Sequence, residues 1–385
     1  MSRMTKKLEA TRRQLREAMP VAEKWAYFDH AAVAPISSPA AEVLRSWLRE
    51  AAQEGDTVWP HWARQLKGTR TAAAELIGAS EDEIALVPNT TAGINLVAEG
   101  FAWQAGDNVV TLDDEFPANV YPWLNLESRG VETRRVPTTD GRVDLDQLAA
   151  HCDQRTRVVS VSWVGYANGC RRDLRVIGEI AQRHEAIFLV DAIQGLGVFP
   201  LNVVEANIDC LSADGHKWLL GPEGAGIAYV SRECLDRLRP VGVGWNSVVH
   251  ATNFSHIELK LKPSAARYEG GTYNMAGLLA LGACLRLLLS LGVENLAAAI
   301  LDFTDRATES LQGLGAEIRS PRHPDERSGI LLFELPGRDP VSLRKHCLTQ
   351  KVALNCRGGG LRISPHAYND QQDLDRLIEA LRSAP

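Results

Sequence analysis

Three positions with chemically useful side chains each come shortly after a run of apolar residues: Asp191, Lys217 and the pair Thr90-Thr91. A carboxylate at the end of a buried run is costly unless it meets a cation or hydrogen-bond donors. A lysine desolvated in the same surroundings has a lowered pKa and becomes a nucleophile. Threonine hydroxyls and free backbone N–H groups at the start of a helix provide a seat for a phosphate group. The three positions therefore offer an acid, a reactive amine and an anion site.

Each of these features also has a plainer explanation. On its own, Asp191 is equally consistent with a cap of the following turn, Lys217 with a solvated loop residue, and the threonines with an ordinary helix N-cap. The combination is more specific, because pyridoxal 5′-phosphate (PLP) requires a carboxylate for its ring nitrogen, a lysine for its aldehyde and a seat for its phosphate. The sequence therefore predicts that PLP is the cofactor and that Lys217 carries it as a Schiff base.

Short apolar runs alternate with helical patterns through the middle of the chain, and this alternation must position the three sites. Short continuous runs suit strands covered on both faces, so the pattern predicts a doubly wound, mostly parallel sheet. Ligands of such sheets gather beyond the carboxyl ends of the strands. The predicted strands are 84–87, 108–112, 131–136, 157–163, 187–190, 210–212 and 226–230, and the predicted helices between them are 91–101, 117–129, 144–151 and 173–184.

The two ends of the chain differ from its middle. The pattern predicts a charged helix, a short strand and two further helices before the first run, at 4–18, 25–29, 39–54 and 59–77. From about residue 275 a long apolar helix leads into a smaller α+β pattern that ends in an amphipathic helix at 370–382. We therefore expect an α/β fold with a large cofactor-binding domain at 22–285 and a small domain made of 1–21 and 286–385.

Composition excludes several classes of partner. The net charge of the 385-residue chain is −6, with 45% hydrophobic and 23% charged residues, so nothing draws it to nucleic acid or anionic membranes. The seven cysteines are scattered without a CxxC pair, which argues against a disulfide framework or a metal site. The N-terminus lacks the apolar core of a signal peptide, and Arg286 interrupts the most apolar stretch at 275–291. We expect a cytoplasmic protein without a bound metal.

The order and spacing of these segments resemble the class V aminotransferase family of fold-type I PLP enzymes, which includes cysteine desulfurases, kynureninases and isopenicillin epimerases. The resemblance covers almost the whole chain. Four further segments look like the family's N-terminal strand and substrate loop, ring-stacking loop, dimer-crossing loop and carboxylate-binding strand, in this order: Tyr27–Ala32, Glu115–Asn119, Arg267–Thr272 and Gly360–His366. Any one of these motifs is weak evidence, but the ordered set is specific.

The resemblance implies roles for the matching residues around the cofactor. Lys217 would carry PLP and then act as the general base at Cα, and Asp191 would keep the ring nitrogen protonated. Gln194 would donate a hydrogen bond to the phenolic oxygen of the ring. The phosphate would be held by Thr90, Thr91 and His216, and by Thr272 of a second subunit.

This sequence departs from the family pattern at two positions, and the resemblance also implies which residues bind the substrate. Phe116 would stack on the ring where the desulfurases have a histidine, which puts desulfurase-type proton transfers in doubt. Arg362 would pair with the substrate α-carboxylate, and His30 and Ala31 lie in the substrate loop. Asp214 stands where many relatives have a phosphate-binding serine. Because an acid repels phosphate, we expect Asp214 to point elsewhere or to pair with a nearby cation, and we leave it out of the predicted site.

Fold and cofactor do not fix the reaction. Desulfurases need a mobile cysteine ahead of the carboxylate-binding arginine, whereas Cys356 lies in a segment that looks too short for such a loop. Tyr166 is equally consistent with a position near the ring oxygen and with ordinary burial. We expect a homodimeric enzyme that deprotonates Cα of a small amino acid, with an aminotransferase preferred and a C–S lyase, desulfurase-like enzyme or amino-acid epimerase as alternatives.

An alternative of another class is a non-catalytic, nucleotide-binding α/β protein. Two short glycine motifs, at 195–197 and 242–244, favour it. Neither is a full Gly-x-Gly-x-x-Gly between a strand and a helix, so the signal is weak.

Overall fold

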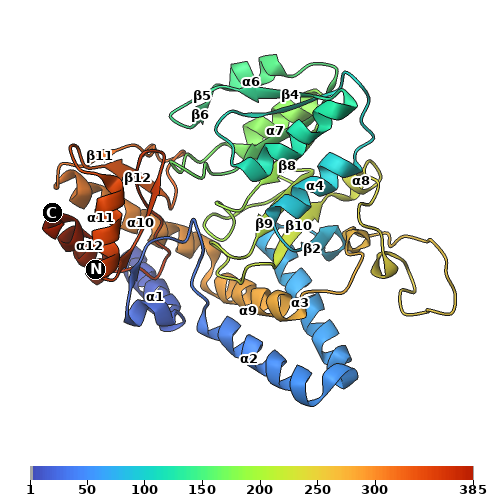
Figure 1. The fold of residues 1–385 in the computed structure, drawn as a ribbon, viewed down its shortest axis with the longest axis horizontal. Helices are drawn as coiled ribbons and strands as arrows, with labels where there is room; N and C mark the ends of the chain where they lie inside the picture. The colour runs from blue at the N-terminus through green and yellow to red at the C-terminus, as the bar shows by residue number, and fades with distance from the viewer. Residues whose placement is uncertain (1–2, 385) are drawn as a thin grey trace.

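A seven-stranded sheet forms the centre of the computed structural model, which describes residues 3–384 (Figure 1). Its strands are ordered β2-β10-β9-β8-β7-β3-β4. Their bounds are β2 Ile84–Val87, β3 Asn108–Leu112, β4 Glu132–Val136, β7 Thr156–Ser162, β8 Ile187–Asp191, β9 Cys210–Asp214 and β10 Gly226–Val230. Strand β10 is antiparallel to both neighbours, and the five strands from β9 to β4 are parallel. The predicted, mostly parallel sheet is confirmed.

The helices between these strands agree with the sequence pattern except in one place. Helices α4 (Thr90–Gly100), α6 (Leu145–His151) and α7 (Leu174–Arg183) follow the prediction closely. The single helix predicted over 117–129 is wrong, because this segment consists of two short 3₁₀ turns flanking the four-residue helix α5 (Tyr121–Leu124). Pro117 and Pro122 lack the N–H group that a continuous helix needs, so the apolar spacing is kept while the helix is interrupted. A small hairpin, β5 (Thr138–Thr139) and β6 (Arg142–Val143), follows β4.

Three long helices pack together beside the sheet: α2 (Ser38–Gln53), α3 (Trp59–Ile77) and α9 (Met275–Leu291) (Figure 1). Most residues of α9 are buried against the other two helices and the sheet, which explains why it is apolar on nearly all sides. Among residues 3–384, no helix by itself has the length and apolar character to span a membrane. Helices α9 and α10 (Val293–Gln312) meet those criteria only as a pair bent by 81°.

The C-terminal part is built around a four-stranded antiparallel sheet, ordered β11-β12-β15-β14. Its elements are β11 Glu317–Ile318, β12 Leu331–Glu334, β14 Asn355–Arg357, β15 Gly360–Ile363, α11 Pro340–Thr349 and α12 Gln371–Ser383. Helix α1 (Arg3–Glu17) packs on α10 at this end of the molecule (Figure 1). Strand β1 (Ala26–Tyr27) pairs with β13 (Val352–Ala353), so residues just after position 22 also join this part. The boundaries at 22 and 285 stay predictions.

One edge of the large sheet collects the chemically interesting positions. Strand β2 runs in the same direction as β9, because each is antiparallel to β10. The carboxyl ends of β2, β3, β7, β8 and β9 therefore lie at the same edge. Helix α4 begins at this edge and lies close to β9, since a Cβ on Gly93 would be only 2.1 Å from Ser212 Oγ. Only glycine permits this approach.

Candidate active site

A cavity of about 350 Å³ lies at this edge of the sheet. Nine predicted site residues line it: Ala31, Thr90, Thr91, Phe116, Asp191, Gln194, His216, Lys217 and Arg362. They come from six separate segments of the chain, which the fold brings together. Asp214, Tyr166 and Arg357 also line it.

Lys217 lies in the turn after β9, and its side chain reaches the cavity. The residue is 9% exposed, and its Nζ atom lies 5.6 Å from the centre of the Phe116 ring. Burial lowers the pKa of Lys217 to about 8, although the nearby Asp191 carboxylate opposes this effect. At pH 7 about a tenth of this amine is therefore neutral and nucleophilic, far more than for a solvated lysine. The solvated-lysine alternative does not describe this residue.

Asp191 is the last residue of β8 and is almost completely buried. Its Oδ1 atom accepts a hydrogen bond from the backbone N–H of Ile193 at 3.1 Å. Burial raises the pKa of Asp191 to about 7, and the nearby Glu115 carboxylate adds to this effect. A protonated ring nitrogen in the cavity would supply the cation that this carboxylate lacks.

The start of α4 forms the anion seat. The helix cap is Asn89, whose side chain accepts from Ala92 N at 2.9 Å, so the threonines are not the cap. Thr90 Oγ1 accepts a hydrogen bond from Asp214 N at 3.0 Å, and Thr90 O accepts one from Ser212 Oγ. Backbone N–H groups in the first turn of a helix have no intrahelical acceptor, and they carry the positive end of the helix dipole. They are suited to a phosphate group.

Asp214 lies in the cavity wall, contrary to its exclusion from the predicted site. His216 Nδ1 lies 2.9 Å from Asp214 Oδ2, and Asp214 Oδ1 has no hydrogen-bond partner in the described chain. Asp214 follows Ser212 by two residues on β9, so both side chains are on the sheet face that contacts α4. This two-residue periodicity was the sequence signal that could have placed it. A positively charged imidazole at position 216 would offset the repulsion between this carboxylate and a bound phosphate.

Phe116 is held at the cavity mouth by the loop after β3. Its ring contacts Tyr166 edge-to-face, with 5.2 Å between the ring centres. The preceding residue, Glu115, is buried and accepts hydrogen bonds from Ser162 N at 2.7 Å and Asn119 Nδ2 at 3.0 Å. This carboxylate fixes the loop, so Phe116 has a defined position facing Lys217.

Strand parity decides which residues of the C-terminal sheet reach the cavity. In the β14–β15 pair, Arg362 lies opposite Asn355, and Cys356 lies opposite Leu361. Arg362 and Arg357 line the cavity, whereas Cys356 Sγ points the other way and donates to Pro340 O at 3.3 Å. Successive residues of a strand face opposite sides, so turning Cys356 toward the cavity would require a change in the register of β14.

Arg362 is almost fully buried and partly engaged. Its Nη1 atom donates to Tyr166 O at 2.6 Å, and Nη2 lies 3.4 Å from Asp29 Oδ1. Its Nε atom has no hydrogen-bond partner in the described chain. A substrate carboxylate would satisfy this unpaired donor.

His30 is not a residue of the cavity wall, which corrects the prediction that it contacts substrate. Its ring is fully buried, with Nδ1 2.9 Å from Ser364 O and Nε2 3.1 Å from Tyr368 Oη. Burial lowers the pKa of His30 well below its ordinary value, so the ring is neutral. The chain turns at this point, since Ala32 N and Val33 N both donate to Asp29 O, and Ala31 rather than His30 reaches the cavity.

Thr272 also lies outside this cavity, on an exposed loop. The residues beside it are anchored, because Glu269 accepts hydrogen bonds from Arg70, Leu86 N and Tyr273 Oη. The hydroxyl of Thr272 therefore projects from a fixed loop. Its predicted role belongs to a second subunit and stays a prediction.

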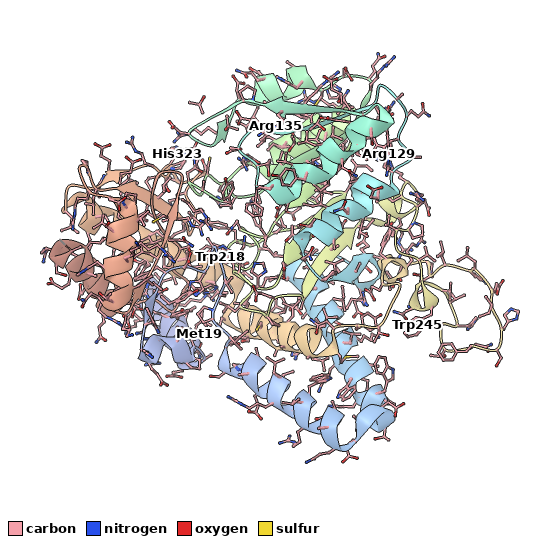
Figure 2. All side chains as sticks on the ribbon, viewed as in Figure 1. Met19, Arg129, Arg135, Trp218, Trp245 and His323 are labelled. Carbon is pink, nitrogen blue, oxygen red and sulfur yellow. The ribbon has the colours of Figure 1, made fainter. Side chains whose placement is uncertain are left out.

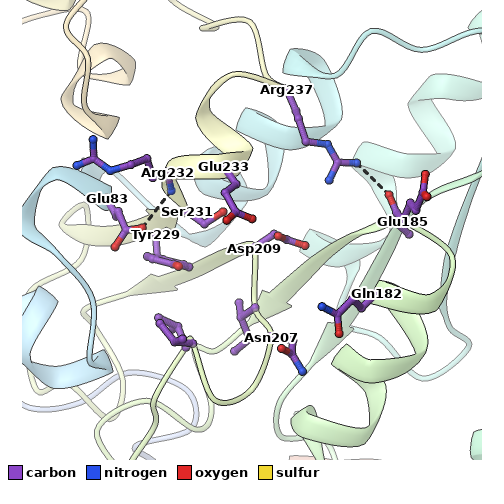
Figure 3. Close-up of a pocket in the computed structure, with 14 residues that line it drawn as sticks. Glu83, Gln182, Glu185, Asn207, Asp209, Tyr229, Ser231, Arg232, Glu233 and Arg237 are labelled. Carbon is purple, nitrogen blue, oxygen red and sulfur yellow. Dashed lines mark hydrogen bonds between the residues drawn. The ribbon is translucent and has the colours of Figure 1, made fainter.

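A second hollow, of about 690 Å³, lies at the opposite, amino edge of the sheet. Glu83 accepts from Arg232 N, and Arg237 donates to Glu185 O across its rim (Figure 3). None of the predicted site residues in the described chain lines it. No lysine is among the described residues that line this hollow, so the candidate active site is the cavity at the carboxyl edge of the sheet.

The glycine motifs that favoured a nucleotide site do not open helices. The segment 195–197 lies in a loop after β8, and 242–244 precedes only a three-residue turn. The helix N-terminus that binds a dinucleotide pyrophosphate is missing at both places within the described residues.

The fold and the cavity together define a fold-type I PLP-dependent enzyme. The buried amine of Lys217 fits the aldehyde of PLP, and the Asp191 carboxylate fits its ring nitrogen. The N-terminus of α4 fits its phosphate. When bound, PLP supplies a ring that accepts electrons from the substrate Cα. The aminotransferase class-V family model matches residues 26–377, and the chain belongs to this PLP-dependent family.

Known relatives support this assignment across the whole chain. A probable cysteine desulfurase of Methanothermobacter thermautotrophicus is 30% identical over 389 residues, which cover 95% of this chain and 96% of the relative. The structure of a cysteine desulfurase from Thermococcus onnurineus NA1 matches with a TM-score of 0.88 and 25% identity, covering 97% of this chain and 98% of that one. The cystine C–S lyase C-DES, solved with its reaction product cysteine persulfide, has the same fold: TM-score 0.87, 23% identity, and coverage of 94% and 98%.

Proposed function

We propose that this enzyme cleaves the Cβ–S bond of a cysteine-type amino acid by β-elimination. One observation distinguishes β-elimination from the desulfurase reaction: none of the seven cysteines, all within the described residues, lines the cavity. Relatives named as cysteine desulfurases support C–S chemistry, whereas the missing thiol argues against sulfur transfer to the protein. The C–S lyase alternative is thereby favoured over the expected aminotransferase.

The residues of the cavity suit this reaction. Arg362 would hold the α-carboxylate, and Lys217 would take the proton from Cα. The electron pair of the Cβ–S bond then leaves with sulfur, which takes up a proton. For a substrate R–S–CH₂–CH(NH₃⁺)–COO⁻ and one water, the balanced products are R–SH, pyruvate and ammonium. Phe116 at the mouth would cover the reacting atoms from solvent.

The test is a product analysis of the purified, PLP-loaded enzyme with L-cystine, S-alkylcysteines and L-cysteine. We expect pyruvate and ammonium in equal amounts, together with a thiol or persulfide. Alanine as the product would instead indicate a desulfurase. Pyruvate formation from L-alanine that depends on a 2-oxo acid would indicate an aminotransferase, and D-amino acid would indicate an epimerase.

Replacement of Cys356 by alanine is expected to change kcat by less than about twofold, because its thiol points to Pro340 and away from the cavity. The measurement is the steady-state rate of pyruvate or sulfide release. A matched Cys347→Ala variant controls for the loss of a thiol packed under the same sheet. A fall of about 100-fold confined to Cys356→Ala would contradict β-elimination and restore the desulfurase mechanism.

We also propose that the enzyme is a homodimer with Thr272 completing the phosphate site of the other subunit. The projecting loop, residues 240–264, extends from the body close to the loop that carries Thr272 (Figure 1), and Trp245 lies on it (Figure 2). It exposes Phe254 (72%), Ile257 (91%) and Leu259 (76%). Asn246 connects the two loops by donating to Glu269 O and Tyr273 Oη. Exposed apolar groups of this size favour burial against another protein surface.

The double variant Ile257→Asp/Leu259→Asp is expected to sediment as a monomer and to bind PLP at least about tenfold more weakly, because charges in the contact cost binding energy and Thr272 is lost from the site. Val204→Asp is the matched control, since Val204 is equally apolar and 69% exposed at the opposite edge of the sheet. A monomeric wild-type enzyme with full activity would contradict the cross-subunit role.

A further inference from the structure

Two hydrogen bonds fix the orientation of the Gln194 side-chain amide. Trp218 Nε1 lies 2.8 Å from Gln194 Oε1, and Gln194 Nε2 lies 3.0 Å from Ala31 O. An indole N–H can only donate and a backbone carbonyl can only accept, so the oxygen and nitrogen of the amide cannot be exchanged. Gln194 is buried and lines the cavity, and its second Nε2–H makes no hydrogen bond in the described chain. It is a donor left free beside the cavity.

Trp218 is itself held on several sides. It is 1% exposed, its carbonyl lies 3.2 Å from His366 Nε2, and its ring packs against that of His30 with 6.1 Å between centres. Gly329 and Gly197 leave room for it, because a Cβ on either would lie 2.6 Å from Trp218 atoms. Trp218 is central in the molecule (Figure 2), next to Lys217 in the chain. The indole is therefore a rigid support for the amide.

We propose that Trp218 is a positioning residue that makes Gln194 present an N–H donor, rather than its carbonyl oxygen, to the phenolic oxygen of PLP. This inference rests on the proposed role of Gln194. If Trp218 is removed, the buried Gln194 Oε1 loses its donor. The amide is then held only by the Ala31 carbonyl, and an unpaired buried oxygen favours side-chain positions that give it a new donor, in which the free N–H no longer points into the cavity.

The direction of the expected effect follows from electrostatics. An N–H donated to the phenolic oxygen stabilises its negative charge, which otherwise attracts the proton on the nitrogen joining Lys217 to the cofactor. The donor therefore lowers the pH at which this nitrogen loses its proton, and its removal raises that pH. Other charged groups face the same cavity and contribute equally in all variants: Asp191, Asp214, His216, Arg357 and Arg362.

The test is a pH titration of the visible absorbance of the PLP-loaded enzyme without substrate, for wild type, Gln194→Ala, Trp218→Phe and the double variant. We expect Gln194→Ala to raise the midpoint by about one pH unit and Trp218→Phe to raise it by at least half as much. The double variant should match Gln194→Ala, because Trp218 acts through Gln194. Trp163→Phe is the matched control, since Trp163 is a buried tryptophan that packs on Gly195 without bonding the amide.

The outcomes distinguish the proposed role of Gln194 from that of Trp218. If Gln194→Ala leaves the midpoint unchanged, the role of Gln194 itself is wrong and this inference falls with it. If Gln194→Ala shifts the midpoint but Trp218→Phe does not, or if their shifts add, only the role of Trp218 is wrong. Should Trp218→Phe fail to fold, benzothienylalanine at position 218 replaces the N–H by sulfur at nearly constant shape, and the same shift is expected.

Discussion

Replacement of Lys217 by alanine is expected to lower kcat for any substrate of this enzyme by a factor of about 10⁴ or more. The amine is the only lysine among the residues that line the cavity, and its burial holds the pKa near 8. It has two tasks, attachment of the cofactor and removal of the Cα proton, and both are lost together. KM should change far less than kcat, because Arg362 remains to bind the carboxylate.

The first measurement for this variant is the absorbance spectrum before and after borohydride, followed by peptide mapping. Wild-type enzyme should show a visible band that disappears on reduction, with the modified lysine at position 217. Lys217→Ala should bind PLP without forming that reducible adduct. Lys67→Ala is the control, since Lys67 is an exposed lysine on α3. A reducible adduct on another lysine, or activity retained in Lys217→Ala, would remove this residue from the proposed mechanism.

The second large effect is expected for Asp191→Asn, with kcat lower by about 10²- to 10⁴-fold at normal protein yield. An amide has nearly the shape of the carboxylate but cannot keep the ring nitrogen protonated, so the ring accepts electrons less readily. Asp209→Asn is the matched control, because Asp209 is a mostly buried carboxylate that also bonds one backbone N–H, at the amino edge of the sheet. Equal losses in both variants would indicate a structural effect only.

The same variant tests the burial of Asp191 in the cofactor-free protein. The pKa of Asp191 is about 7 in the fold and near 4 when unfolded, so the folded chain binds the extra proton between these values. The stability contributed by the protonated carboxyl is complete below pH 4 and is lost as pH rises through 7. The free energy of unfolding of Asp191→Asn should therefore rise relative to wild type by up to about 4 kcal/mol between pH 4 and 8.

Urea unfolding at several pH values measures this difference. His30 and His366, whose pKa values are lowered by burial, change stability in the opposite direction over part of the same range. They are present in both proteins, so the comparison cancels them. Added PLP should remove much of the difference by supplying a cation to Asp191. A constant difference between the two proteins across the range would show that this carboxylate is ionised throughout.

Local sequence patterns predicted most of the secondary structure of this protein and its cofactor. Short, mostly apolar runs predicted six of the seven strands of the large sheet, because a strand covered on both faces must be largely apolar. The edge strand β4 was also predicted, although four of its five residues are polar and only Val136 is buried. The positions of Asp191, Lys217 and the Thr90-Thr91 pair after three of these runs together predicted the cofactor. The interrupted helix after β3 was predicted as continuous, since its apolar spacing is helical and the effect of Pro117 and Pro122 was underestimated.

The tertiary structure decided which side of each segment faces the cavity. Ala31 lines it while His30 is buried behind it, and Arg362 lines it while Cys356 faces α11. A shift of one residue reverses the facing of a strand, and the register is set by pairing with other strands, here β15 with β12 and β14, and β9 with β8 and β10. Asp214 enters the site for the same reason. The sequence by itself determined most of the elements and the cofactor, and it predicted Lys217 as the anchor, whereas the tertiary arrangement decided which thiols, imidazoles and carboxylates line the cavity.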